Sequence, residues 1–392
     1  MHNNSISNLL DLKDIYVKNI KHNDHTVKLY LTSTSKPTQC PACNNLTSRV
    51  HDYRNQVIKD LPIMNKHTFL ILRKRRYVCS CGKKFYEKYN FLPRYRRMTN
   101  RLAAYICSKL TQCVPITSVA QEVNLSPPTV TRIFDNVQYP RALTMPSVLS
   151  IDEFKGNTEY GKYQCTLVDV KKKKIIDVLP DRKQDYLIEY FSSIPRFERD
   201  KVKFFVSDMW KQYADLARIY FPNAKIIIDK YHFIRQVSWA IENVRKRVQK
   251  TMPANLRRYF KRSRRLILKR NEKLTYEEKI QLENLLYYND DLRQAYLLKE
   301  QFFDICHMTK YSEQRKAFSN WIKYAETQNI LEFKSCIKTY RNWHKEILNA
   351  FKYGYTNGVI EGYNNKIKVL KRVSYGVRKF NRFRNRILHV TN

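Results

Sequence analysis

The spacing of apolar residues predicts a mixed α/β domain in the middle of the chain. Short apolar runs predict strands there, and helical periodicity predicts the segments that separate the later strands. In order, the predicted elements are a strand at 148–154, strands at 163–170 and 174–179, a helix at 184–193, a strand at 202–206, a helix at 211–220 and a strand at 225–228. Three strands followed by alternating helices and strands indicate an RNase H-like α/β core.

The segments on either side of this domain have different patterns. Short alternating strands are expected from residue 15 to about 91, and helices from 93 to 138. Pro253 is the only proline after Pro222, and no glycine lies between Gly161 and Gly354, so an almost wholly helical insertion is predicted at 231–350. The predicted domains are a β-rich module at 1–92, a helical domain at 93–145, the first part of the core at 146–232, the insertion at 233–350 and a C-terminal helix completing the core at 351–392.

Part of the helical domain has the pattern of a helix-turn-helix. A helix at 116–123 is followed by a turn at residues 124–125 and a second helix at 126–134, where Ser126 suits the N-cap and Pro127 the first helical position. A helix-turn-helix places its second helix in the DNA major groove. The side chains presented there would be Thr129, Thr131 and Arg132. The alternative is a plain helical hairpin between two domains.

Two cysteine pairs in the β-rich module have the spacing of a metal site. Four thiolates on two tight turns suit a tetrahedral structural Zn²⁺, and Gly82 eases the second turn. The ligands would be Cys40, Cys43, Cys79 and Cys81, although the second pair is C-x-C and the alternative is unrelated free thiols. The ungrouped cysteines are expected in the cores: Cys107, Cys113, Cys165, Cys306 and Cys336.

The net charge of the chain indicates what kind of molecule it binds. The chain has 74 Lys and Arg against 35 Asp and Glu, a formal net charge of +39. Such an excess attracts phosphate backbones, so we expect a nucleic acid partner rather than merely a basic surface. No run of eighteen apolar residues appears, so we expect a soluble cytoplasmic protein with no membrane partner.

Three acids stand out against this basic background. Asp152 lies in the first predicted strand of the core, Asp208 follows the fourth, and Glu361 lies on the last predicted helix. Hard cations such as Mg²⁺ prefer oxygen ligands, and a pair of them can stabilise both oxygens of a phosphodiester displacement. Each acid alone would more often be a salt bridge or a helix cap. Asp229 and His232 could help line the site, with capping of the following helix as the alternative.

The last predicted helix has two contrasting sides. At 100° per residue, one side carries Ile360, Tyr363, Ile367 and Leu370. The other side carries Glu361, Asn365, Lys368 and Arg372. We therefore expect the first side to pack on the sheet and the second to hold a metal and contact DNA.

These motifs resemble those of bacterial insertion-sequence transposases of the ISL-three family. The resemblance rests on residues 150–154, 207–210, 221–232 and 357–366 in this order, and it spans nearly the whole chain. It implies a DDE triad of Asp152, Asp208 and Glu361 with Mg²⁺ or Mn²⁺ on an RNase H-like core. It also implies binding of terminal inverted repeats, cleavage and strand transfer into target DNA, a homo-oligomer on double-stranded DNA, and a place in the bacterial nucleoid.

Two rival functions stay open from the sequence. One is a non-catalytic sequence-specific DNA-binding regulator, such as a decayed transposase retained for its N-terminal half. The other is a structure-selective nuclease or resolvase that cuts DNA without joining it. Loss of cleavage with retained end binding in Asp152→Asn would discriminate the enzyme from the regulator, and joined ends would exclude the nuclease.

Overall fold

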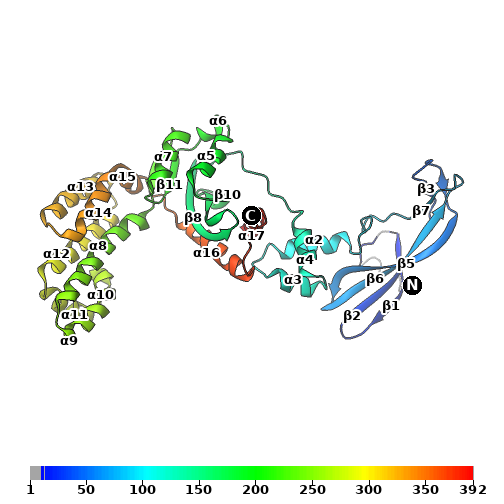
Figure 1. Cartoon of the computed structure of the whole chain (residues 1–392), viewed down its shortest axis with the longest axis horizontal. Helices are drawn as coiled ribbons and strands as arrows, with labels where there is room; N and C mark the ends of the chain where they lie inside the picture. The colour runs from blue at the N-terminus through cyan, green and yellow to red at the C-terminus, as the bar shows by residue number, and fades with distance from the viewer. Residues whose placement is uncertain (1–9, 13, 392) are drawn as a thin grey trace. The chain divides into compact units, whose positions relative to one another are not determined.

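The computed structural model describes residues 10–12 and 14–391. It divides into two units, one formed by residues 1–140 with 367–392 and the other by residues 141–366. Each unit is described separately below, with the elements labelled as in Figure 1.

The first unit begins with an antiparallel and parallel β-sheet in the order β1-β2-β6-β5, with β7 added to β6. Its strands are β1 (Ile15–His22), β2 (Thr26–Ser33), β5 (Val50–Ile63), β6 (Lys66–Val78) and β7 (Lys84–Tyr86). The short β3 (Thr38–Gln39) and β4 (Leu46–Thr47) pair separately. Leucine and isoleucine side chains of β1, β2, β5 and β6 form the core of this module.

Strand β5 is the main element that apolar periodicity did not predict. It carries several charged residues, including Asp52, Arg54 and Lys59, so no apolar run marks it. Its pairing with β6 is antiparallel and nearly continuous. The connection between them has positive φ at Met64 (51°) and Asn65 (59°), as a tight hairpin turn requires.

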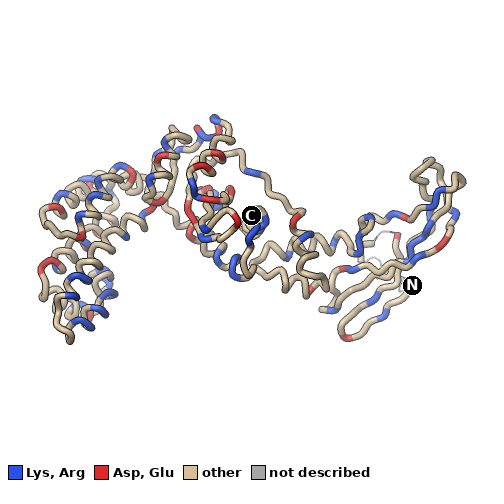
Figure 2. Tube along the Cα trace, viewed as in Figure 1, with Lys and Arg blue, Asp and Glu red and all other residues tan. Residues whose placement is uncertain are grey.

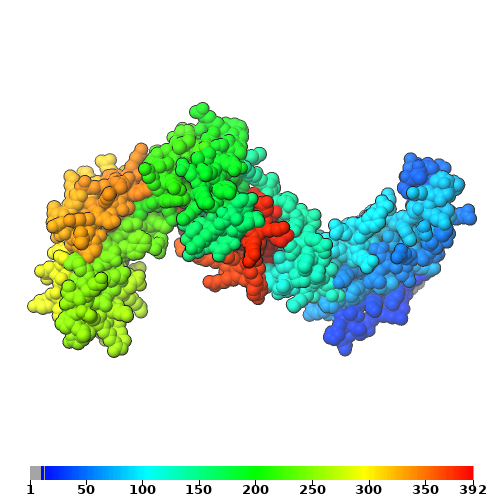
Figure 3. Space-filling view, viewed as in Figure 1, coloured from blue at the N-terminus to red at the C-terminus, as the bar shows by residue number. Residues whose placement is uncertain are grey.

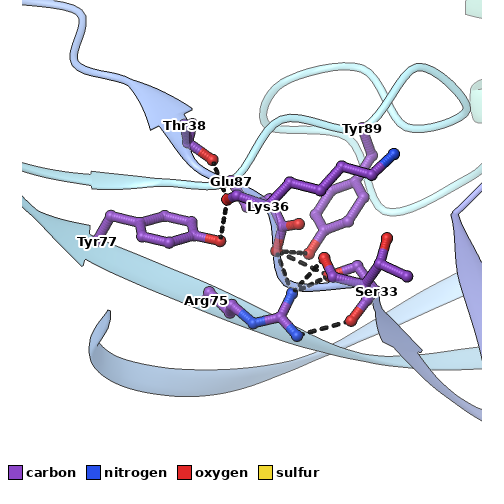
Figure 4. A network of polar contacts seen from close by, with 8 residues as sticks. Ser33, Lys36, Thr38, Arg75, Tyr77, Glu87 and Tyr89 are labelled. Carbon is purple, nitrogen blue, oxygen red and sulfur yellow. Dashed lines mark hydrogen bonds and ion pairs between the residues drawn. The ribbon is translucent and has the colours of Figure 1, made fainter. Parts of the chain in front are cut away.

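A buried arginine on β6 connects the end of β2 to the loop that follows β7. Arg75 Nη1 donates to Ser33 Oγ (2.5 Å) and Nη2 to the Ser33 carbonyl (2.6 Å), as Figure 4 shows. Glu87 lies beside them and accepts hydrogen bonds from Ser33 Oγ (2.9 Å) and Tyr89 OH (2.7 Å). The guanidinium is therefore satisfied away from water, and burial with the Glu87 carboxylate raises the pKa of Tyr89.

A small helical domain completes the first unit. Its helices are α2 (Asn100–Lys109), α3 (Ile116–Glu122), α4 (Pro127–Phe134) and, from the end of the chain, α17 (Phe380–Thr391). Apolar residues of α2, α3 and α4 pack together around Val130, Ile106 and Leu102. Positive φ at Asn124 (52°) turns the chain between α3 and α4.

The second unit contains a five-stranded sheet in the order β10-β9-β8-β11-β12. The strands are β8 (Val148–Thr158), β9 (Gly161–Asp169), β10 (Lys174–Leu179), β11 (Phe204–Ser207) and β12 (Lys225–Ile228). The first three pair antiparallel, whereas β11 is parallel to both β8 and β12. This is the predicted RNase H-like arrangement, in which the first and fourth strands of the core are neighbours.

Alternation along the strands separates two faces of this sheet. Leu149, Ile151 and Phe205 pack with α5 (Gln184–Ser192) and α7 (Lys211–Tyr220). Val148 and Val206 face the other way and pack with the apolar residues of α8 (Lys230–Thr251). By the same alternation, Asp152 points to the α8 side.

The predicted insertion is helical and shares its core with the α8 side of the sheet. After α8 it contains α9 (Ala254–Arg262), α10 (Arg264–Leu268), α11 (Tyr276–Tyr287), α12 (Asp290–His307), α13 (Tyr311–Thr327), α14 (Leu331–Asn342) and α15 (His344–Tyr353). The short α6 (Arg196–Arg199) precedes β11, a 3₁₀ turn spans Asn271–Lys273, and α16 spans Gly358–Val373. Across residues 10–12 and 14–391, no helix has the length and apolar character needed to cross a membrane.

Candidate active site and DNA-binding elements

The pairing of β8 with β11 places two of the three predicted acids side by side. Phe204, Phe205 and Val206 pair with Val148, Leu149 and Ser150, respectively. Two residues beyond the last pair, this register reaches Asp208 on one strand and Asp152 on the other. Adjacent strands are about 4.8 Å apart, so the two carboxylates lie side by side where β11 ends, in the middle of the sheet.

The two carboxylates affect each other's chemistry. Burial and the nearby Asp208 charge raise the pKa of Asp152 to about 7. The buried Asp208 Oδ1 lies 2.8 Å from His232 Nε2, an ion-pair contact between the two side chains. Two acids held this close are costly without a positive charge between them, so the pair is suited to binding a cation.

His232, in the first turn of α8, faces this site. Burial alone would lower the pKa of His232, but contact with Asp208 and the charges of Asp229 and Asp152 raise it overall. Asp229 occupies the N-cap position of α8 without a side-chain capping bond. The Tyr231 backbone N–H nevertheless acts to lower the pKa of Asp229, against the larger effect of burial, so this carboxylate acts at the start of α8 as well as on other contacts.

Asp229 also helps anchor the start of α16. Its Oδ1 accepts a hydrogen bond from the Asn357 backbone N–H (2.8 Å), and Ser150 Oγ donates to Asn357 Oδ1 (2.6 Å). Asp229 and Asn357 are both 6% exposed, and burial raises the pKa of Asp229. Asn357, the residue that precedes α16, thus connects this helix to β8 at Ser150, two residues before Asp152.

A second asparagine connects α16 directly to the acid pair. Asn364 Nδ2 donates to Asp152 Oδ2 (2.8 Å), while its Oδ1 accepts from Thr166 Oγ1 on β9 (3.3 Å). Apolar periodicity did not single out Asn357 or Asn364. A signal was nevertheless present for Asn364, since it follows Glu361 by three residues and therefore lies on the same side of the helix.

The remaining predicted residues of α16 lie where the periodicity places them. Ile360, Ile367 and Leu370 are buried, and Tyr363 is partly buried with its hydroxyl donating to the Lys173 carbonyl (2.5 Å). The opposite side carries the exposed residues Glu361, Asn365, Lys368 and Arg372. Glu153, next to Asp152, ion-pairs with Arg182 (2.7 Å), and its charge makes a minor contribution, after burial and Asp208, to the raised pKa of Asp152.

The four predicted cysteine ligands form one cluster in the first unit. Within the described part of the chain, no other set of three or more His, Cys, Asp or Glu residues brings its ligand atoms within 4.8 Å of one another. Cys40 Sγ lies 3.7 Å from Cys81 Sγ, and Cys43 Sγ lies 3.5 Å from Cys79 Sγ. Gly82 has a φ of 82°, as the tight second turn requires. This cluster of soft ligands supports a structural zinc ion.

The predicted helix-turn-helix is formed by α3 and α4. Ser126 occupies the N-cap position of α4 but makes no capping bond, and its hydroxyl instead contacts Thr129 Oγ1 (2.9 Å). Arg132 is exposed and donates to Thr129 Oγ1 (3.2 Å), whereas Thr131 is half-buried and donates to the Pro127 carbonyl (2.9 Å). Arg132 is thus the most accessible of the three predicted groove-reading residues.

Comparison with known proteins agrees with this arrangement. Residues 149–387 match the family model described as a transposase of the ISL3 DDE group. Residues 36–81 match the zinc-finger of transposase IS204/IS1001/IS1096/IS1165, and residues 87–138 match the helix-turn-helix domain of transposase family ISL3.

Individual relatives include two proteins named as insertion-sequence transposases. The chain is 27% identical over 364 residues to the transposase for insertion sequence element IS1001 of Bordetella parapertussis, covering 90% of this chain and 88% of that protein. It is 24% identical over 253 residues to the transposase for insertion sequence element IS1557 of Mycobacterium tuberculosis, covering 59% and 56%. A 107-residue stretch is 32% identical to a Lactococcus lactis protein named ATP-dependent protease and covers 27% of this chain.

A zinc-binding β module, a helix-turn-helix and an RNase H-like core define a DNA-binding protein of the DDE transposase class. The family model of the core covers more than half of the chain. The chain belongs to the ISL3 family of transposases.

Proposed function

We propose that this protein cuts the ends of an insertion sequence and joins them to target DNA, with Asp152, Asp208 and Glu361 as its catalytic acids. The observation that carries the proposal is the β8–β11 register, which brings Asp152 beside Asp208. The raised pKa of Asp152 is typical of a functional carboxylate and is unusual for a solvated surface acid.

Glu361 is the third acid because of its position on α16. Asn364, which contacts Asp152, follows Glu361 by three residues, and side chains with this spacing are neighbours on a helix. Glu361 is exposed at this point of the helix. It would reach the acid pair from this turn of α16, on the side from which DNA would approach.

The donor set fits Mg²⁺ or Mn²⁺. Carboxylate oxygens are the ligands that these hard cations prefer, and the acid pair places two partly buried carboxylates side by side. Asp152 and Asp208 would hold such ions together with Glu361. When bound, divalent cations stabilise the charge that develops on the attacking and leaving oxygens of a phosphodiester.

The neighbouring residues hold these acids in place. Asn364 orients the Asp152 carboxylate through Oδ2, and the backbone N–H of Glu153 donates to Oδ1 (2.8 Å). His232 orients Asp208 by the short contact at Oδ1. Asn357 and Asp229 fix the start of α16 and thereby the position of Glu361.

The first unit would recognise the DNA. We assign residues 1–92 and 93–145 to binding of the terminal inverted repeats, with Thr129, Thr131 and Arg132 at the major groove. Residues 146–232 and 351–392 would carry the reaction, with residues 233–350 as an inserted helical domain. Asn365, Lys368 and Arg372 on the exposed side of α16 would contact the DNA backbone. Lysine and arginine occur along the whole trace in Figure 2, consistent with several sites of phosphate contact.

The protein would act as a homo-oligomer on DNA. An insertion sequence has two ends, and the described part of the chain provides one helix-turn-helix and one pair of aspartates. Two copies would supply one recognition element and one set of acids to each end. Because its substrate is chromosomal DNA, the protein would work at the bacterial nucleoid.

A cleavage assay tests the proposal. Labelled DNA that carries the repeats flanking this gene would be incubated with wild type, Asp152→Asn or Glu361→Gln, in Mg²⁺ or EDTA. We expect metal-dependent nicking at the repeat boundary and joined products with wild type, and neither with the two variants, which should still bind the repeat. Glu153→Gln is the matched control, because Glu153 adjoins Asp152 but pairs with Arg182.

Other outcomes would replace the proposal with a specific rival. Tight repeat binding without any cutting by wild type would indicate a DNA-binding regulator. Cuts without joined products would indicate a structure-selective nuclease. Full activity of Asp152→Asn would remove the site assignment itself.

A further inference from the structure

The C-terminal helix α17 is built into the helix-turn-helix domain. Arg382 Nε and Nη2 donate to the two carboxylate oxygens of Asp135, just after α4, at 2.7 and 2.6 Å. His389 Nε2 lies 2.7 Å from the Cys107 carbonyl on α2, so its Nδ1 accepts from Tyr139 OH, also at 2.7 Å. Figure 3 shows these C-terminal residues, in red, against the blue-green residues of the helix-turn-helix domain. The domain is therefore completed by a segment about 250 residues away in sequence.

A buried arginine strengthens this docking. Arg386 is 4% exposed and donates from Nη2 to the carbonyls of Gln112 (2.9 Å) and Val114 (3.1 Å), in the loop before α3. Burial lowers the pKa of Arg386 to about 10. The two carbonyls satisfy Nη2, while the buried Nη1 has no hydrogen-bond partner among the described residues. With the Arg382–Asp135 ion pair, these contacts hold α17 against the domain.

The segment between α16 and α17 borders the recognition helix. It turns through Tyr375 (φ 51°) and Gly376 (φ 89°), both in the left-handed region. Residues 373–379 and Arg382 line a recess of about 260 Å³, whose other wall is formed by Pro115, Ile116 and Thr117 at the start of α3 and by Thr131 on α4. The predicted DNA-reading helix thus contributes Thr131 to this recess, beside the start of α3.

The charges around this recess favour a polyanion. No acidic residue occurs after Glu361, whereas nine Lys and Arg follow it. Arg382, Arg384 and Arg386 face the helix-turn-helix domain, where Arg384 donates to the Tyr139 carbonyl (2.8 Å) and Arg382 neutralises Asp135. Arg378 and Lys379 are exposed, and both line the recess.

We propose that residues 374–379 are a second DNA-contacting element, in which Arg378 and Lys379 bind the phosphate backbone beside the groove that α4 enters. In a helix-turn-helix the second helix occupies the major groove and the first crosses the backbone. A rim shared by α3, α4 and residues 374–379 therefore follows the same stretch of backbone. The inference rests on the proposed binding of element ends by the helix-turn-helix, and it adds a contact from the far end of the chain.

The test measures binding of the full-length protein to labelled element-end DNA over a series of salt concentrations. Each neutralised phosphate contributes about 0.9 to the slope of log K against log salt, so Arg378→Ala/Lys379→Ala should flatten the slope by about 1.8. Affinity should fall by a similar factor for specific and unrelated DNA, because phosphate contacts carry no sequence information. Arg378→Lys/Lys379→Arg should keep the wild-type slope.

Two controls separate this inference from the proposed function. Arg315→Ala/Lys316→Ala removes the same charge from exposed positions on α13, and an equal loss of slope there would attribute the effect to net charge and overturn the inference. Arg132→Ala should reduce the preference for the element end over unrelated DNA. If Arg132→Ala reduces this preference while Arg378→Ala/Lys379→Ala keeps the wild-type slope, the proposed phosphate contact of residues 374–379 is wrong. Recognition of the element end by the helix-turn-helix would then still stand. Absence of end preference in wild type would overturn end recognition itself.

Discussion

Asn364 on α16 donates a hydrogen bond from Nδ2 to Oδ2 of Asp152 on β8, over 2.8 Å, although the two residues are 212 positions apart. The same side chain accepts from Thr166 on β9, so it connects the helix to two strands. This contact orients one proposed catalytic acid and places the helix that carries another.

Asn364→Ala should slow DNA cleavage much more than it weakens DNA binding. Residues that orient metal-binding carboxylates typically contribute a factor of roughly 10–100 to metal affinity or activity. The measurement is the single-turnover cleavage rate at saturating protein, beside the dissociation constant for the element end. Asn365→Ala, the exposed neighbour, should instead weaken binding and leave the rate for bound DNA close to wild type. An unchanged cleavage rate for Asn364→Ala would show that Asp152 needs no support from α16.

Asp152→Asn should make the protein more stable in EDTA at pH 8. The pKa of Asp152 is raised in the folded protein to about 7 from a usual value of 3.8. As the pH rises from about 4 to 7, the unfolded chain loses this proton before the folded chain does, so stability falls and then levels off above 7. Replacement of Asp152 by asparagine removes the cost of burying its charged carboxylate at pH 8, which is on the order of a few kcal/mol.

Thermal unfolding at several pH values measures this difference. The stabilisation should be larger at pH 8 than at pH 5.5, and Mg²⁺ should raise the melting temperature of wild type more than that of Asp152→Asn. Equal stability of the two proteins at pH 8 would contradict the raised pKa.

Cys79→Ser should abolish zinc binding and unfold the zinc module. Four thiolates hold one ion, and loss of a ligand removes folding free energy from a small module of this kind. The zinc content of purified protein, measured by elemental analysis, should fall from one ion per chain to none. Binding to the element end should also weaken. Cys113→Ser is the control, since Cys113 lies outside the cluster and should leave the zinc content unchanged.

Glu87→Ala should destabilise the β module by about 2 kcal/mol, because Ser33, Tyr89 and the buried Arg75 lose a shared acceptor. The Arg75 and Glu87 side chains are only 9% and 14% exposed. Asp52→Ala removes the corresponding partner of Arg76, where the side chains are 36% and 43% exposed, and should cost much less than Glu87→Ala. Urea unfolding compares the two variants, and equal costs would show that the buried network adds no stability.

Local patterns in the sequence were sufficient for much of the architecture. The helix predicted at 211–220 is α7 (Lys211–Tyr220), and the predicted strands of the core reappear within a few residues of their bounds. The reason is that apolar periodicity records which side of a helix or strand faces a core. The four cysteines could also be predicted, because each pair lies on a tight turn whose spacing is local.

Other features depended on contacts between distant segments. Strand β5 lacks an apolar signature because much of it faces solvent, and only its pairing with β6 identifies it as a strand. Asn357 and Asn364 gained their roles only when α16 met β8 and β9, and α17 joined the helix-turn-helix domain through Arg382 and Arg386. The sequence by itself determined the family, the element order and the candidate acids, since these are properties of short motifs and local periodicity. Only the tertiary structure decided which polar side chains surround those acids, because a hydrogen bond between residues more than 200 positions apart leaves no periodic trace in the chain.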